Sequence, residues 1–332
     1  MAIPQEVSIG VAIESTYATS VTPTVFYEPT DENLDWQKMT AQGQGLRVGK
    51  FTDFADRRVV PAAQGTGDFT VEAISKSMGK LFQACLGAGV STAIVAPAYM
   101  QNFTPGNTPS SLTVQKPAIE AGGTVDPLTF LGCMVSDWEL VIPNVGIPTL
   151  KLNLDIGNLA TATAYATPSY PTAATLYHFG NAAFSSGTYT AATTTTLATC
   201  ATAMTNVRSL TLAGKNNLTA DRFNGGMAGR KKQPIMGKRE WTGTVELEYD
   251  ATTFRDAYIA DTTLSLISKI TGAAVGASTE TLQVNLPAIK LEKGIPNSNA
   301  DGLVIVQHDF TVLDDKTNPP VQIQYLTADT TI

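Results

Sequence analysis

Hydrophobic and polar residues alternate in several short stretches of the chain. Residues 67–73 (GDFTVEA) place Asp, Thr and Glu on one side and Phe, Val and Ala on the other. The same alternation occurs in residues 135–142, 149–157 and 242–249. A period of two is typical of antiparallel strands that have one face in the core and one face in water. The pattern therefore predicts a mainly β protein.

Two stretches have the spacing of a helix instead. Residues 75–87 carry apolar side chains at positions i, i+3, i+4 and i+7, with Ser75 as the candidate cap and Gly87 as the stop. Residues 251–261 form a weaker pattern of the same kind, with Phe254 on the apolar side. We expect one short helix at each place.

The order of these predicted elements occurs twice along the chain. Each half has a loop rich in Gly and Arg, then an alternating strand, one helix and three strands. An internal repeat of this kind predicts two tandem modules, over residues 1–165 and 207–332. The Ala/Thr-rich segment 166–206 between them is either a connecting linker or a strand hairpin that lies on a neighbouring module.

The composition limits the class of protein. Charged residues are 15% of the 332, against about 25% in an ordinary soluble domain, while hydrophobic residues are 43%. These values exclude a charge-rich disordered chain, and no stretch approaches the roughly eighteen apolar residues of a membrane helix. The three scattered cysteines fit folding in a reducing cytosol, and the N-terminus has no secretory signal pattern. The low charge predicts that much of the surface contacts other protein.

Residues suited to catalysis or metal binding are scarce. His178 and His308 are the two histidines, and neither has a metal-ligand companion at i+2 to i+5. The three cysteines lie far apart and form no CxxC pair. The sequence therefore predicts no catalytic site, no metal and no cofactor.

Acidic residues recur at matching places of the predicted strands. A glycosidase would pair two such carboxylates across a cleft, but an active site would normally break the symmetry between two halves. The simpler interpretation is an acidic stripe on a sheet face, which is either solvated or, if the sheets close into a ring, lines a channel. Its candidate residues are Asp68, Glu72, Asp137, Glu139, Asp155, Glu246 and Glu248.

Basic residues gather in two loops that occupy equivalent places in the two halves. The first loop, within residues 43–61, and the second, within residues 225–239, together contain Arg47, Lys50, Arg57, Arg58, Arg230, Lys231, Lys232, Lys238 and Arg239. A nucleic-acid patch is one interpretation, but aromatic residues are sparse there and the net charge of the chain is −7. Cationic arms that meet an acidic surface of another subunit fit the composition better.

Several segments resemble the major tail tube proteins of long-tailed, non-contractile bacteriophages. The resemblance begins at residues 10–29 (GVAIESTYATSVTPTVFYEP) and continues through residues 45–87, where an Arg-bearing loop precedes an acidic strand and a helix that ends at Leu-Gly. Residues 209–218 (SLTLAGKNNL) and 237–250 (GKREWTGTVELEYD) extend it into the second half. The resemblance implies tandem tail-tube modules, each a β-sandwich or partial barrel with one flanking α-helix.

The same resemblance implies a structural, non-enzymatic role in a virion tail, with synthesis in the cytoplasm of a bacterial host. Six modules would close into a ring, and stacked rings would form the conduit for viral DNA. Three two-module chains per ring are slightly favoured over six chains. The acidic stripe would face the lumen with Lys151 as a partial offset, and the two basic loops would contact the next ring.

The implied partners are other copies of the chain, a tape measure protein, a tail terminator and a distal tail protein, with DNA passing unbound and no membrane involved. A carbohydrate-binding or hydrolysing β-domain is the alternative function. That alternative needs an aromatic platform, for which the sequence offers Trp36, Trp138 and Trp241.

Overall fold

The structure is a computed structural model that describes residues 7–297 and 302–332, and it confirms the mainly β class. The elements of the first half are β1 (Ile9–Ile13), β2 (Val25–Tyr27), β3 (Pro29–Glu32), β4 (Asp35–Gln42), β5 (Arg58–Glu72), α1 (Gly79–Leu86), β6 (Gly87–Val95), β7 (Ala98–Pro105), β8 (Leu112–Ile119), β9 (Val125–Ile142), β10 (Thr149–Ile156) and β11 (Asn158–Ala160). Short 3-10 turns lie at Ala55–Arg57 and Phe179–Asn181.

The segment between the two predicted modules contains a hairpin that the sequence left undecided. The elements of this hairpin and of the second half are β12 (Ala182–Thr190), β13 (Thr199–Met204), β14 (Val207–Lys215), β15 (Leu218–Thr219), β16 (Ile235–Met236), β17 (Glu240–Glu248), α2 (Thr253–Ile259), β18 (Leu264–Val275), β19 (Ser278–Leu291), β20 (Ile305–Val312) and β21 (Gln322–Thr327). The Ala/Thr-rich segment 166–206 thus contains β12 and β13, which pair with each other, and β12 also pairs with β18.

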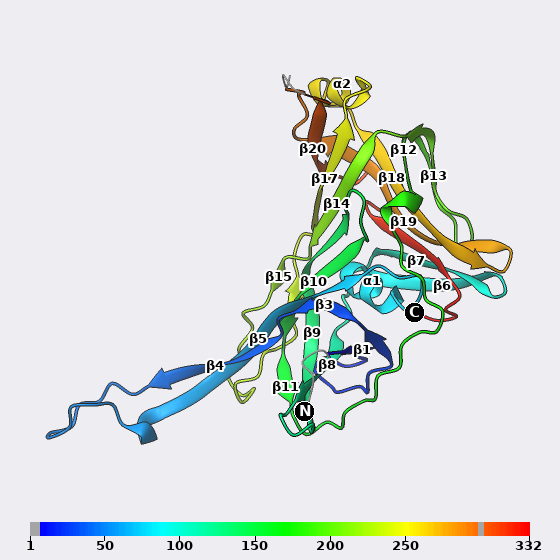
Figure 1. The fold of residues 1–332 in the computed structure, drawn as a ribbon. Coiled ribbons are helices and arrows are strands. Elements are labelled where there is room, and N and C mark those ends of the chain that lie inside the picture. The colour runs from blue at the N-terminus through cyan, green and yellow to red at the C-terminus, as the bar shows by residue number, and fades with distance from the viewer. Residues whose placement is uncertain (1–6, 298–301) are drawn as a thin grey trace.

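A run of antiparallel strands crosses the molecule and connects the two halves. Its order is β5, β10, β9, β14, β17 and β20, with β14 bonded to β9 on one edge and to β17 on the other. β3 and β4 continue the run beyond β5. The hairpin formed by β4 and β5 leaves the body as a long arm, while α2 lies at the opposite end of the molecule (Figure 1).

The two halves pair their strands in the same order. In the first half β1, β8, β9, β10 and β5 are successive neighbours. In the second half β12, β18, β19, β20 and β17 are successive neighbours. One helix follows β5 and one follows β17. Only the first half of the chain has an extra hairpin, β6–β7, between its helix and its next strand.

Both predicted helices are present, but the start of the first lies later than predicted. α1 ends at Gly87, whose φ of 94° places it in the left-handed conformation that favours glycine. The residue before α1 is Met78 and not Ser75. The Ser75 side chain instead accepts a hydrogen bond from the backbone N–H of Thr175 at 3.0 Å, which ties the helix region to the segment before β12.

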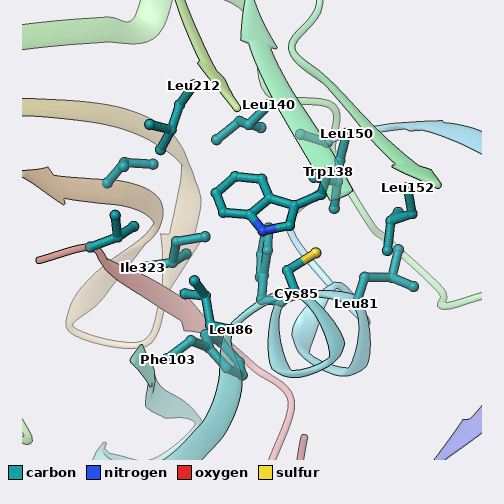
Figure 2. Close-up of a cluster of buried hydrophobic side chains, with 14 of the residues drawn as sticks. Leu81, Cys85, Leu86, Phe103, Trp138, Leu140, Leu150, Leu152, Leu212 and Ile323 are labelled. Carbon is teal, nitrogen blue, oxygen red and sulfur yellow. The ribbon is translucent and has the colours of Figure 1, made fainter. Parts of the chain in front are cut away.

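The core sits between the halves and contains side chains from both. Trp138 of β9 is 1% exposed, and Figure 2 shows its indole ring between Leu140 and Leu212 of the sheet and Cys85 of α1, with Ile323 of β21 nearby. One hydrophobic cluster includes all of these residues. The two halves therefore share a core and are not separately packed domains.

Candidate functional site

Carboxylates from both halves lie on one face of the central sheet. Along β5, β9 and β17 they alternate with buried residues such as Phe69, Trp138 and Val245, as period-two strands require. We call this surface the acidic face, and it includes the carboxylates of Asp68, Glu72, Asp137, Glu139, Glu246, Glu248 and Asp309. All but the last were predicted as members of the acidic stripe.

The acidic face carries fewer basic side chains than carboxylates. Two of them pair with its carboxylates, and Lys215 of β14 is exposed opposite Asp137. Lys151 of β10 lies 3.0 Å from Asp68, and this hydrogen bond raises the pKa of the lysine. Arg208 of β14 lies 3.0 Å from Glu248 and 4.0 Å from Glu246. Exposed pairs such as these contribute about 0–1 kcal/mol, so their main effect is to reduce the negative charge locally.

The sequence analysis missed two residues of this surface, and the period of two could have found the first of them. Asp309 occupies a polar position of the alternating run 304–314, on the opposite side from the buried His308. Arg208 is the second residue of β14, and alternation with the buried Leu210 and Leu212 would place it on the core side. A register shift between Val207 and Ser209 turns it to the acidic face, so its place is visible only in the structure.

Asp155 and Lys231 have a different place from the one predicted. Asp155 was expected on the acidic stripe and Lys231 in a loop that contacts another ring, but they are only 7% and 4% exposed and form an ion pair with each other. Burial raises the pKa of Asp155, although the Lys231 ammonium opposes that effect. The loop between β15 and β16 thus covers this end of the sheet, and neither side chain faces solvent.

Replacing Lys231 with methionine is expected to release this loop. Breaking a buried ion pair costs about 3–5 kcal/mol because the remaining charge stays without a partner, and a surface loop can detach to hydrate it. We expect trypsin to cut after Arg230 and Lys232 at least about tenfold faster than in the parent protein. Limited proteolysis followed by mass spectrometry measures this rate.

The matched control is Lys238→Met, because Lys238 is exposed and lies in the same basic loop. The double variant Asp155→Leu, Lys231→Met removes both charges and is expected to return the rate toward that of the parent. Equal cleavage rates in the parent and in Lys231→Met would contradict the anchoring role of the pair.

The first basic loop is an exposed arm with an apolar tip. Leu46, Val48 and Phe51 at the tip are fully exposed. Behind the tip, the guanidinium groups of Arg47 and Arg57 lie 4.9 Å and 5.6 Å from the ring centre of Phe54. The predicted basic residues Lys50 and Arg58 are also exposed on this arm. Fully exposed apolar side chains in this number indicate a surface that meets another protein.

The second basic loop folds back on the body. Arg230, Lys232 and Lys238 are exposed, but Arg239 donates hydrogen bonds to the carbonyls of Leu86 and Gly106 at 2.8 Å and 2.6 Å. Its guanidinium therefore lies at the C-terminus of α1, where cations are favourable. Burial of this side chain lowers its pKa. Of the predicted basic residues, Lys231 is buried, Arg239 is half-buried and the others are exposed.

No group of side chains in residues 7–297 and 302–332 has the arrangement of a metal site. His308 is buried against Phe254 of α2 at 5.4 Å between ring centres, and burial lowers its pKa. His178 is exposed before β12. Cys85 and Cys133 are buried thiols, and burial raises the pKa of each. His308, Cys85 and Cys133 thus belong to the interior, whereas His178 is a surface residue.

The comparison with protein families decides what these surfaces belong to. The profile described as phage tail tube protein matches residues 4–312. The chain belongs to this family. Comparison with curated proteins found no match.

Membership of the tail tube family identifies a structural protein of the virion tail and implies self-assembly into a tube. Among the described residues, no helix is long and apolar enough to cross a bilayer. Two of the three tryptophans that a carbohydrate platform would need, Trp138 and Trp241, are buried. The tail tube family accounts for the low charge and the exposed apolar arm, since both suit a surface covered by other subunits.

Proposed function

We propose that this tail tube protein polymerises as stacked rings whose bore carries viral DNA. The observation that carries the proposal is the acidic face, because it is continuous across the strands that join both halves of the chain. A negative lining repels phosphates and avoids the contacts with Lys and Arg that would hold DNA in place. The protein would then act as a passive conduit without binding DNA or catalysing a reaction.

The equivalent pairing orders of the two halves support tandem modules within one chain. In this proposal three chains supply six modules to each ring, an arrangement that is only slightly favoured over six chains per ring. The first basic loop contacts the next ring through the arm, where Leu46, Val48 and Phe51 would become buried. The tape measure protein, the tail terminator and the distal tail protein are the other partners in the assembled tail.

Electron microscopy of the purified protein tests this function directly. We expect negative-stain images to show rings or tubes of constant diameter with a central hole, and sedimentation to show a species that grows with concentration. Ring formation should not require a low salt concentration, because the burial of apolar side chains rather than surface charge drives the association. A protein that stays monomeric at every concentration would contradict the proposal.

A further inference from the structure

β14, the strand that joins the two halves within one chain, has a counterpart in residues 31–37. Among the described residues, this counterpart pairs with a strand on one side only. β14 pairs with β17 on one side, and in the first half residues 31–37 pair with β5 in the equivalent way. Gly214 of β14 lies opposite Trp241, and Trp36 lies opposite Gly65. The correspondence places Trp36 where the second half has Gly214.

β9, the other partner of β14, also has a counterpart, which is β19 together with the residues that follow it. β9 and β19 match in pairing and burial: Val135 pairs with Leu154, and Leu291 pairs with Phe310. Val135 and Leu291 are each followed by two partly or fully exposed residues and then by a buried one. The buried residue is Trp138 in β9 and Gly294 beyond the end of β19. Residues 293–297 therefore correspond to the part of β9 that pairs with β14.

Among the described residues, neither counterpart has a second neighbouring strand. Asp137–Ile142 of β9 pairs with Leu210–Lys215 of β14. Within residues 7–297 and 302–332, residues 31–37 form backbone ladders with β5 alone, and residues 293–297 belong to no strand. The molecule thus contains one complete junction and the two separated sides of a second one.

We infer that residues 31–37 of one copy pair with residues 293–297 of a second copy and so repeat the junction between β14 and β9. The strands would be antiparallel, with Gln37 opposite Lys293, Trp36 opposite Gly294 and Asp35 opposite Ile295. The inference rests on the proposed ring, for which it names the contact between neighbouring chains.

Side-chain size supports this register. In the existing junction Gly214 lies opposite Trp138, and the indole leaves no room for a Cβ on Gly214. In the inferred junction the large and small residues exchange strands, since Trp36 would lie opposite Gly294. A junction of this kind needs one large and one small residue at this position, and both pairs satisfy it.

The free edge of residues 31–37 is covered by side chains while the chain is alone. The backbone N–H of Trp36 donates to the Asp35 carboxylate at 2.7 Å, and the backbone carbonyl of Leu34 accepts from the Lys116 ammonium at 3.1 Å. Charged groups of this kind protect edge strands from unspecific pairing. The residue opposite Leu34 would be Pro296, which has no N–H to donate, so Lys116 can keep its bond in the assembled ring.

Engineered disulfides test the inferred register in assembled tubes. The variant Asp35→Cys, Ile295→Cys, in a Cys200→Ser background, is expected to form covalent links between chains on mild oxidation, because directly opposite residues lie within disulfide range. Gln37→Cys, Lys293→Cys is a second pair of exposed positions with the same expectation. Denaturing electrophoresis without reductant measures the linked oligomers.

Two controls make the result decisive. Ala213→Cys, Glu139→Cys joins the equivalent pair of the existing junction and is expected to link within one chain, leaving a monomer. Met39→Cys, Ile295→Cys is out of register and should give at least about tenfold less linkage than the matched pair. The inferred contact would be overturned if tubes form normally but neither matched pair links more than the out-of-register pair. The proposed tube would not be affected by that result. An absence of rings or tubes in the parent protein would instead count against the proposed function.

Discussion

Replacing Trp138 with alanine is expected to lower the free energy of unfolding by about 4 kcal/mol, which is the largest single-residue effect that we expect on stability. The indole is 1% exposed and lies between sheet leucines and α1 (Figure 2). Its loss leaves a cavity where both halves of the chain meet, and a close-packed core refills such a space only in part. Urea denaturation followed by circular dichroism measures the change.

Trp138→Phe is the matched control for this experiment. Phenylalanine fills much of the same volume, and the indole N–H has no hydrogen-bond partner among the described residues, so its removal breaks no hydrogen bond. We expect the phenylalanine variant to lose less than half as much stability as the alanine variant. Similar losses in both variants would show that shape at this position matters more than filled volume.

Reversing the charge of the acidic face is expected to have the largest effect on function. The triple variant Glu72→Lys, Glu139→Lys, Glu246→Lys changes partly exposed side chains, so folding and tube formation should be preserved. If these residues line the bore, lysines would bind passing phosphates and slow DNA transfer. We expect phage titre to fall by about a hundredfold or more.

The control carries the same charge change away from the acidic face. Glu120, Asp126 and Asp314 are exposed at the β8–β9 hairpin and after β20, and their replacement by lysine should leave the titre nearly unchanged. Higher ionic strength during DNA release in vitro should partly restore the rate of the acidic-face variant, since salt screens the phosphate contacts. Intact tubes with an undiminished titre would refute the placement of the acidic face in the bore.

Much of the fold could be predicted because its signals are local. A strand with one wet face must alternate, so Asp68 and Glu139 could be assigned to a polar face from their neighbours alone. A helix that ends in the left-handed conformation favours glycine, and Gly87 marked that end correctly. The start of α1 was harder, because Ser75 could cap a helix but binds Thr175, a residue 100 positions away.

The sequence by itself therefore determined the mainly β class, the two helices, the polar side of each strand and the order of elements that resembles tail tube proteins. Only the tertiary structure decided which polar residues on those strands reach solvent. Asp155 has the alternation of a surface residue, yet Lys231, 76 positions away, covers it. Periodicity depends on neighbours along one strand, whereas burial depends on which distant loop packs over that strand. The same reason explains why pairing of β14 with β9, and the free edge that it left at residues 31–37, became visible only in three dimensions.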